Sequence, residues 1–371
     1  MYAGLFLSDP HMDESGFANA GRTLSATHFA GRYRLVDFAL SNMVNSKIFR
    51  IGVVLNSHYQ SLLSHIGMGK EWDLARKIGG VTFFPPYLTD QRASVDNEID
   101  GPFSRAAEFL AASKADYVVL ADSSVAYNMD YRPAMEAHSA SGADVTAIYT
   151  KKYITAAEHP HAAVFEISPD NRVTAITTPL LARDDQNVSL GAYIMHKKYF
   201  LRLTSGEKNC GILKFSLVLL ASALDRLKVN AFKFTGYSAK VCSMGTYFYH
   251  NMEMLDASKR DALFDYEKRR IFTSRRDSLP TKYGKEANVN NSIIAEGCRI
   301  DGTVSNSVLC RNVVVKAGAI VKNCVLHDGV AVEKNAELDW VIADNEVIIS
   351  ENRSMMGYST YPVYIEGSRI I

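Results

Sequence analysis

The sequence is short of net charge and of long apolar runs, and each shortage excludes a class of protein. Its 371 residues carry 41 Lys and Arg against 40 Asp and Glu, a formal net charge of +1. Such a balance gives no support to binding nucleic acid or an anionic membrane surface. No apolar run reaches the length that crosses a bilayer, so we expect no membrane-spanning segment. The opening stretch MYAGLFLSDPHMDE has no basic residues before its apolar part, and we do not expect a signal peptide.

Cysteine is also scarce. The five cysteines are odd in number and form no CxxC pair. This pattern predicts free thiols in a reducing compartment, the cytoplasm, and small buried side chains in place of a disulfide framework or a metal site. The positions are Cys210, Cys242, Cys298, Cys310 and Cys324.

What the chain does have is an alternation of strand and helix over its first two-thirds. Short β-branched runs at residues 51–56, 117–122 and 144–150 alternate with helical patterns at residues 104–115 and 132–142. Pro133 suits the first turn of the second helix and Gly142 suits its end. Strand, helix, strand predicts an α/β fold with a mostly parallel sheet, and the strand-rich stretch that follows predicts antiparallel strands at one edge. We assign residues 1–249 to this domain.

The composition then changes twice. Residues 250–276 are charged and helical in pattern before a break at Pro280, which predicts a connecting helix and linker over residues 250–286. Over residues 287–371 a short phrase recurs, as NSII, NSVL, NCVL and DWVI, at spacings of 15, 17 and 16 residues. A branched apolar residue about every six positions, three steps a turn, predicts a β-solenoid. A small β-sandwich is the alternative, but sandwich strands do not repeat one phrase at near-constant spacing.

The stretch VVLADSSVAYNMDY, residues 118–131, runs from an apolar strand directly into Asp122. A carboxylate at such a strand end is typical of metal-binding sites in nucleotide-handling α/β enzymes. The surrounding residues raise the question whether the site still works.

Several long stretches resemble the bacterial ADP-glucose pyrophosphorylase (glucose-1-phosphate adenylyltransferase) family. They are HFAGRYRLVDFALSNMVNS, EWDLARKIGGVTFFPP, YNMDY, SLGAYIM, MGTYFYHNMEML and NSIIAEGCRIDGTVSNSVL. The resemblance implies a Rossmann-like (GT-A-like) nucleotidyltransferase domain with a mixed sheet, followed by a left-handed parallel β-helix. It also implies a family reaction, in which glucose 1-phosphate and ATP give ADP-glucose for glycogen with Mg²⁺ as the cofactor. Such chemistry depends on positioning and on neutralising phosphate charge with amides, lysines and metal.

The parts that this chemistry needs are missing from the matching positions. Leu24 stands where the family has a lysine, Thr178 replaces the lysine of a Glu-Lys-Pro phrase, and Ser243 replaces the second metal-binding aspartate. Asp122 lies in a strand end that is one residue longer than the family's. The glycine-rich loop reads SDPHMDESGFANAG, and the nucleotide-gripping loop reads NEIDGPFSRAAEF. We therefore predict no catalytic residues, no metal site and no retained cofactor.

A group of basic residues offers a different site. The phrase GRTLSATHFAGRYR carries Arg22, His28, Arg32 and Arg34, where the family binds sugar bisphosphates such as fructose 1,6-bisphosphate. Guanidinium groups suit phosphate. Arg353 and, by a weaker match, Arg369 are candidates to complete this effector site from the β-helix. Salt bridges with Asp37 or with the solenoid are an equally weighted interpretation of the same arginines.

The resemblance therefore implies a regulatory companion subunit, without catalysis of its own, in a hetero-oligomer, a tetramer, with a catalytic subunit. Two alternatives stay open. The chain is a weakly active sugar-phosphate nucleotidyltransferase that uses Asp122, or an acyltransferase that uses His327 of the solenoid.

Overall fold

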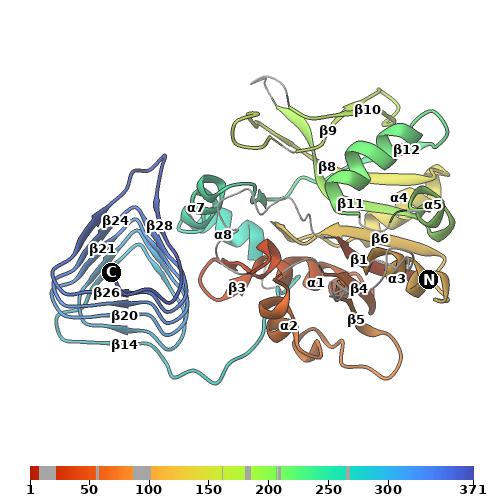
Figure 1. The fold of residues 1–371 in the computed structure, drawn as a ribbon. Helices are drawn as coiled ribbons and strands as arrows, with labels where there is room; N and C mark the ends of the chain where they lie inside the picture. Colours follow the sequence, from red (N-terminus) through yellow and green to blue (C-terminus); the bar gives the residue numbers. More distant parts are fainter. Residues whose placement is uncertain are drawn as a thin grey trace, which may run out of the picture.

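The computed structural model describes residues 1–7, 22–55, 58–86, 102–160, 162–179, 185–205, 207, 210–264 and 268–371. An α/β domain comes first and a β-helix follows (Figure 1). The predicted fold class is confirmed, with a mixed sheet in the first domain and stacked parallel strands, consistent with a left-handed β-helix, in the second.

A nine-stranded sheet forms the centre of the α/β domain within the described residues. Its order is β10-β9-β11-β6-β1-β4-β5, with β8 beside β11 and β12 beside β8. Strand β1 pairs in parallel with β4 and β6, whereas β11 runs antiparallel to β6, β8 and β9. The antiparallel pairs thus lie on one side of the sheet, as the sequence predicts. The strands are β1 Tyr2–Leu7, β2 His28–Phe29, β3 Tyr33–Arg34, β4 Arg50–Val54, β5 Gly80–Phe84, β6 Tyr117–Asp122, β7 Val125–Tyr127, β8 Val145–Lys152, β9 Val164–Ile167, β10 Val173–Thr177, β11 Gln186–His196, β12 Val229–Lys233 and β13 Ser238–Lys240.

The central strands are apolar throughout because both faces of the sheet are buried. Successive side chains of a strand point to opposite faces, so Leu120 joins one hydrophobic cluster and Val119 joins the other. Helix α4 has a proline in its first turn, and Gly142 ends it at a φ of 58°, as predicted. The helices are α1 Leu35–Asn45, α2 Gln60–Ile66, α3 Pro102–Ala111, α4 Arg132–Ser141, α5 Lys197–Leu203, α6 Ile212–Lys214, α7 Met244–Glu253 and α8 Ala257–Phe264.

The β-helix consists of three sheets of five parallel strands each. Branched side chains such as Val304, Val315 and Val321 point inward and form one continuous core. The first sheet contains β14 Lys282–Tyr283, β17 Arg299–Ile300, β20 Val314–Val315, β23 Ala331–Val332 and β26 Ile348–Ile349. The second contains β15 Asn288–Asn290, β18 Thr303–Ser305, β21 Ile320–Lys322, β24 Glu337–Asp339 and β27 Ser354–Met356. The third contains β16 Ile293–Ile294, β19 Val308–Leu309, β22 Val325–Leu326, β25 Val341–Ala343 and β28 Val363–Ile365.

One corner of the β-helix is shorter than its neighbours. Only Asp301 and Gly302 join β17 to β18, whereas four residues, 316–319, join β20 to β21. A Cβ at Gly302 would lie 2.4 Å from the Ala319 carbonyl oxygen, so glycine lets the short corner pack closely. A hollow of about 460 Å³ lies at this place, with Lys285 and Lys316 among its lining residues.

The register of the fourth repeated phrase corrects the prediction. Asn291, Asn306 and Asn323 all have a positive φ at the same corner of successive coils, and the next residue in this column is Trp340, with a φ of 55°. The phrase that begins at Asp339 was therefore placed one residue too early. Asparagine tolerates the left-handed region, and tryptophan rarely occupies it, so this corner could not be recognised from its residue type.

The charged linker is helical only in its first part. Helix α8 ends at Phe264, and residues 268–281 contain no helix or strand. The extended segment is fixed by hydrogen bonds, because the Phe272 N–H donates to Ser41 Oγ at 2.8 Å and Asn45 Nδ2 donates to the Arg270 carbonyl at 3.1 Å. Within the predicted connecting helix and linker, residues 250–286, the described helical part thus ends with α8, and residues 268–281 are extended.

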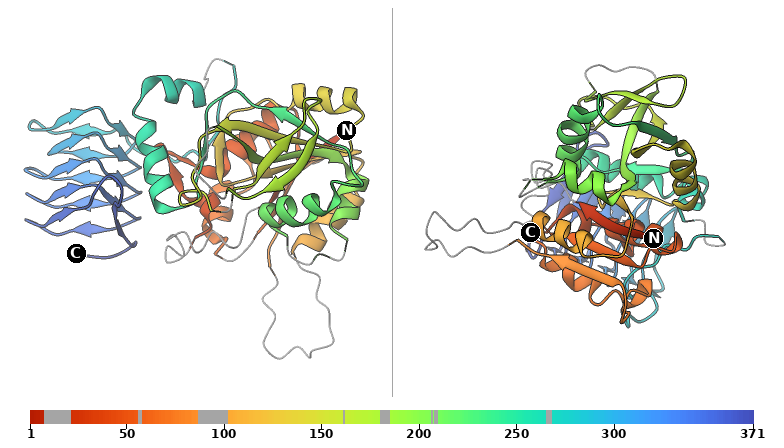
Figure 2. Two further views of the ribbon diagram at one scale, coloured as in Figure 1. Left: turned by 90° about the horizontal axis from the view of Figure 1, so that it is seen from above. Right: turned by 90° about the vertical axis from the view of Figure 1, so that its right-hand side faces the viewer.

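The two domains pack against each other through a shared core. The β-helix stands beside α7 and β3 at one end of the molecule (Figures 1 and 2). Phe38 and Tyr247 of the first domain join Val308, Val325 and Ile342 of the third β-helix sheet in one hydrophobic cluster. Among the helices of the described ranges, none has both the length and the apolar character needed to cross a membrane.

Candidate functional site

The strand-end carboxylate of Asp122 is engaged by the chain itself. Asp122 ends β6 and pairs with Leu7 of β1, and its side chain is buried. Its Oδ1 accepts the backbone N–H of Ser124 at 2.8 Å and the Ser124 hydroxyl at 2.5 Å. An aspartate that bonds the backbone two residues later stabilises a turn. The two serines of the ADSS phrase are thus part of this strand end.

A lysine lies on the other side of the same carboxylate. Lys240 ends β13, which pairs antiparallel with β7, and its Nζ is 3.9 Å from Asp122 Oδ2. Strand β11 also comes close, because a Cβ at Gly191, where φ is 66°, would lie 2.5 Å from the Asp122 Cβ. Glycine is required at that position for steric reasons. Asp122 is therefore enclosed by hydroxyl, amide and ammonium donors.

The residues at this strand end do not fit Mg²⁺. The ion needs several oxygen ligands in near-octahedral geometry. One oxygen of Asp122 accepts two hydrogen bonds, and the other faces a cation. Among the residues that the structure describes, no group of three or more His, Cys, Asp or Glu side chains is arranged to hold a metal ion.

Ser243 begins a helix. Its Oγ accepts the backbone N–H of Thr246 at 3.1 Å, and Thr246 Oγ1 accepts the Ser243 N–H at 2.9 Å, which makes a capping box at the start of α7. The preceding residue, Cys242, has its Sγ 3.4 Å from His159 Nδ1. Burial lowers the pKa of His159 to about 3, so this imidazole is neutral at neutral pH.

The other two substituted positions lie in different surroundings. Leu24 lies in a short 3-10 turn, Leu24–Ala26, and packs in the cluster that contains Phe29 and Tyr33. An apolar side chain here is core. Thr178 follows β10, the edge strand of the sheet, and is half-buried. The degenerate loop at residues 8–21 and residues 97–101 of the phrase NEIDGPFSRAAEF lie outside the described residues, and the rest of that phrase, residues 102–109, belongs to α3.

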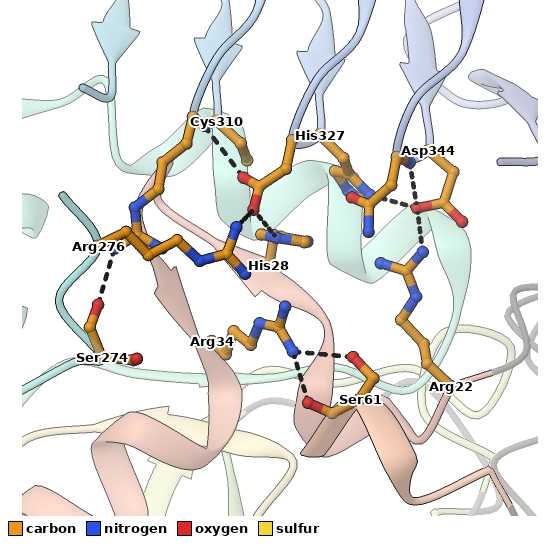
Figure 3. A network of polar contacts seen from close by, with 12 residues as sticks. Arg22, His28, Arg34, Ser61, Ser274, Arg276, Cys310, His327 and Asp344 are labelled. Atoms are coloured by element: carbon orange, nitrogen blue, oxygen red, sulfur yellow. Dashed lines mark hydrogen bonds and ion pairs between the residues drawn. The ribbon is translucent and has the colours of Figure 1, made fainter. Parts of the chain in front are cut away.

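Three of the predicted basic residues, Arg22, His28 and Arg34, lie where the domains meet, in an interdomain seam (Figure 3). We define it by Arg22, His28 and Arg34 of the α/β domain and His327, Asp328 and Asp344 of the β-helix. All but Asp328 are buried. Arg22 Nη2 is 2.6 Å from Asp344 Oδ1, which also lies 2.8 Å from His327 Nδ1.

Asp344 and His327 are further tied to neighbouring tyrosines. Tyr364 OH donates to Asp344 Oδ2 at 3.1 Å, and Tyr247 OH is 2.7 Å from His327 Nε2. Both nitrogens of the buried His327 ring are therefore hydrogen-bonded. This arrangement does not fit the free base that an acyltransferase would need.

Asp328 is the second acceptor in the seam. Its Oδ2 lies 3.2 Å from His28 Nε2 and 3.1 Å from Arg276 Nη1, and its Oδ1 accepts the Arg311 N–H at 3.0 Å. The rings of His28 and His327 are 4.9 Å apart. Arg311 in turn bonds Glu296 at 2.6 Å.

Arg34 has a different environment. Its guanidinium donates to the carbonyl and the hydroxyl of Ser61 at 3.0 and 2.9 Å, and only its backbone N–H reaches Asp37, at 2.9 Å. Within the described chain, no carboxylate lies within ion-pair distance of this guanidinium. The Arg32 guanidinium lies 5.5 Å from the centre of the Tyr33 ring.

Burial sets the titration behaviour of the seam. Burial lowers the pKa of His28 to about 3, although Asp328 opposes the shift, and lowers the pKa of Arg34 to about 10. Burial also raises the pKa of Asp328 and Asp344, but contacts with His28 and Arg276, and with His327 and Arg22, hold both values well below the ordinary range. At neutral pH the seam holds charged aspartates, charged arginines and a neutral His28.

The structure thus brings Arg22, His28 and Arg34 together, with Arg32 next to them in sequence. Arg353 and Arg369 are exposed, and Arg369 pairs with Glu366. Whether any of them binds an effector stays a prediction. Arg22 forms a salt bridge with the solenoid through Asp344, and the neutral His28 lies 3.2 Å from Asp328 of the solenoid.

Sequence reasoning missed the partners, Asp328, Asp344 and Lys240. The two aspartates follow the third-sheet strands of successive coils, at the corner that faces the first domain. Their position, two residues after the repeated phrases NCVL and DWVI, is the sequence feature that could have indicated them. Lys240 had none, since its approach to Asp122 depends on the pairing of β13 with β7.

Comparisons with known proteins agree with both domains. A family model described as "Nucleotidyl transferase" matches residues 24–236, and one described as "GlmU-like, C-terminal hexapeptide" matches residues 279–360.

Curated relatives resemble most of the chain. The "Glycogen biosynthesis protein GlgD" of Bacillus subtilis (strain 168) is 31% identical over 347 residues, which cover 93% of this chain and 90% of the relative. The "Glucose-1-phosphate adenylyltransferase" of Fervidobacterium nodosum is 33% identical over 327 residues, 87% of this chain and 78% of the relative. The "Glycogen biosynthesis protein GlgD" of Geobacillus stearothermophilus is 32% identical over 303 residues, 81% and 77%.

Proposed function

Because the chain belongs to the glucose-1-phosphate adenylyltransferase family of nucleotidyl transferases, we propose that it acts in glycogen biosynthesis as a regulatory, non-catalytic subunit. Its partner is a catalytic ADP-glucose pyrophosphorylase subunit, in a cytoplasmic hetero-oligomer, a tetramer. It modulates the synthesis of ADP-glucose from glucose 1-phosphate and ATP by that partner.

The environment of Asp122 carries this proposal. A nucleotidyl transferase must neutralise the charge of its phosphates at the end of this strand. Here the carboxylate is taken up by Ser124 and Lys240, Ser243 caps α7, and Leu24 packs in the core. Removing a single preorganised partner of a reaction typically lowers the rate by a factor of about 10² or more. Several such changes together are expected to leave the fold intact and to abolish nucleotidyl transfer.

The proposed regulatory ligand binds at the basic residues. Arg22, His28, Arg32 and Arg34, with Arg353 from the β-helix, are the proposed binding residues for a sugar bisphosphate. A ligand there regulates the partner only if it favours one state of the assembly over another. The position of the seam between the two domains supports this role, because a change there alters how the domains pack.

The experiment is an assay of ADP-glucose formation with Mg²⁺, by the purified chain alone, by its catalytic partner alone and by the mixture. We expect no turnover by the lone chain and a changed rate or effector response in the mixture. Robust turnover by the lone chain would refute the proposal. A mixture that behaves as the catalytic subunit alone, although the two chains co-purify, would refute the regulatory role.

A second candidate is a weak nucleotidyl transferase in its own right, favoured by the retention of Asp122 at the strand end. Restoring the lost groups tests it. The combination Ser243→Asp, Leu24→Lys and Lys240→Ala returns a carboxylate and a lysine and removes the competing ammonium. We expect at most slight activity, since the stretches at residues 8–21 and 97–109 differ from the family's in sequence as well.

A further inference from the structure

The interdomain seam buries basic groups that its carboxylates do not all engage. Arg22, Arg276 and Arg311 each have a carboxylate partner, but no described carboxylate lies within ion-pair distance of the buried Arg34 guanidinium. In addition, Arg22 Nη1 is buried and has no hydrogen-bond partner among the described residues. Buried cationic donors without partners are costly, which favours an anion at this place.

The anions that the structure does place here belong to the β-helix. Asp344 receives Arg22, and Asp328 receives His28 and Arg276. Figure 3 shows Arg22 and Asp344 pointing toward each other from opposite sides of the seam, with His28 and Arg34 beside them. Asp344 thus occupies a position at which Arg22 would meet a phosphate oxygen, and Asp328 occupies one at which His28 would do so.

We propose that Asp344 and Asp328 form an internal latch, which closes the interdomain seam in the absence of a ligand and yields to a phosphorylated ligand that displaces them from Arg22 and His28. The proposal rests on the proposed function for the choice of a sugar bisphosphate as the ligand, but not for the latch itself.

Competition follows from the chemistry of the groups. A carboxylate and a phosphate use the same donors, since a guanidinium bonds either of them through parallel N–H groups. The phosphate carries more charge and more acceptor oxygens, so it can also engage Arg34 and the free Nη1 of Arg22. The aspartates are tethered to the β-helix and need no binding entropy, so they prevail until a ligand is present.

The latch has a consequence for the β-helix. Asp344 also holds the Asn345 N–H at 2.8 Å, and Asp328 holds the Arg311 N–H at 3.0 Å. A ligand that displaces the aspartates therefore acts directly on the corner of the β-helix. In this way, occupation of the seam would change the packing of one domain on the other.

The first test compares anion binding by the unmodified full chain and by Asp344→Asn, with fructose 1,6-bisphosphate as the probe and calorimetry as the readout. Asparagine keeps the size of the side chain and removes the competing charge. We expect the Kd to fall by about tenfold or more, because a like charge is removed from the path of the anion. Asp301→Asn is the matched control, since Asp301 is a β-helix carboxylate paired with Arg299 outside the seam, and its Kd should equal that of the unmodified chain.

The second test needs no variant. Hydrogen exchange of the unmodified chain is followed at the Arg311 and Asn345 amides with and without fructose 1,6-bisphosphate. Displacement of the latch predicts faster exchange at both amides, whereas simple binding to a closed seam predicts slower exchange. Fructose is the uncharged control and should change neither.

Three results would overturn the latch: an unchanged or higher Kd for a folded Asp344→Asn, no binding by either protein, or slower exchange on addition of the probe. Both tests use the isolated chain. They can therefore succeed when the mixture with a catalytic subunit shows no regulation, and fail when it does.

Discussion

At the scale of single residues, Ser124 near the strand-end carboxylate and Ser243 at the start of α7 serve the local framework. The hydroxyl of Ser243 accepts a hydrogen bond from the third residue of α7, and the hydroxyl of Ser124 donates to Asp122. Both side chains satisfy groups that would otherwise be unpaired at the end of an element. Substitutions at these positions should therefore first change the free energy of unfolding.

Replacing Ser243 separates capping from chemistry. We expect Ser243→Ala to lower the free energy of unfolding by about 1 kcal/mol, the usual value of a helix cap. Ser243→Asp should leave it nearly unchanged, because aspartate caps equally well. Urea unfolding checks both. Equal losses for the two variants would show that the hydroxyl does not act as a cap.

The sequence predicted local structure correctly where a single residue determines it, as at the ends of a helix. Pro133 and Gly142 bound α4 as predicted. The interpretation did not identify Lys240 as the neighbour of Asp122, because that contact depends on two strands far apart in the sequence. The partner of Arg22 was predicted only as Asp37 or the solenoid, and no partner was predicted for His28.

At the scale of elements, the β-helix depends on its corners as much as on its apolar stack. Asn291, Asn306 and Asn323 stand above one another with positive φ, and Asn291 Nδ2 donates to Asn306 Oδ1 at 2.8 Å. Asparagine adopts this conformation more easily than other side chains do. The repeat in the sequence was visible because these corners demand the same residue type.

We expect Asn306→Ala to lower the free energy of unfolding by about 1–2 kcal/mol, the cost of placing alanine in the left-handed region. Asn288→Ala is the control, since Asn288 is an exposed strand residue and its replacement should stay within about 0.5 kcal/mol. Thermal and urea unfolding measure the difference. A corner variant as stable as the control would contradict this account of the coil.

The fourth coil shows why the presence of a strand is predicted better than its register. The repeated phrase led to the right fold, but the positive φ of Trp340 broke the asparagine pattern by one residue. Where helix gives way to extended chain in the predicted connecting helix and linker was hidden for a similar reason. Ser41 and Asn45 hold that segment extended, and these tertiary hydrogen bonds cannot be read from local composition.

At the scale of the whole molecule, buried charges at the interdomain seam join the domains. Breaking a buried ion pair on one side leaves a charge without a partner and costs about 3–5 kcal/mol. The Arg22–Asp344 pair is buried on both sides, so it should behave in this way.

A double-mutant cycle measures this coupling. We expect Arg22→Met and Asp344→Leu each to destabilise strongly, and the double variant to lose clearly less than the sum of the two. The exposed pair Arg299–Asp301 is the matched comparison, with an expected coupling of about 0–1 kcal/mol. Additive losses at the seam in urea unfolding would show that the pair does not couple the domains.

The seam should also make stability depend on pH. The pKa of His28 is about 3 in the folded chain, against about 6.5 when unfolded, so the unfolded chain takes up a proton first as the pH falls. Stability is then complete above about pH 6.5 and falls below it by at most about 1.4 kcal/mol per pH unit. Asp328, whose pKa is also lowered, adds its loss only below about pH 3.9.

Urea midpoints of the unmodified chain and of His28→Asn, followed between about pH 7 and about pH 4.5, test this dependence. The curve of the variant should be flatter over that range. Parallel curves would mean that His28 does not titrate with folding. Aspartates titrate below this pH range, so the difference between the two curves reports the His28 imidazole.

The two-residue corner at Asp301 and Gly302 is a position at which the β-helix should accept an insertion. Its neighbours span the same turn with four residues. An insertion of two residues after Asp301 would restore the common coil length and grow into the adjoining hollow without disturbing the strands on either side. A reporter or an affinity peptide grafted there would stand clear of the contact between the domains.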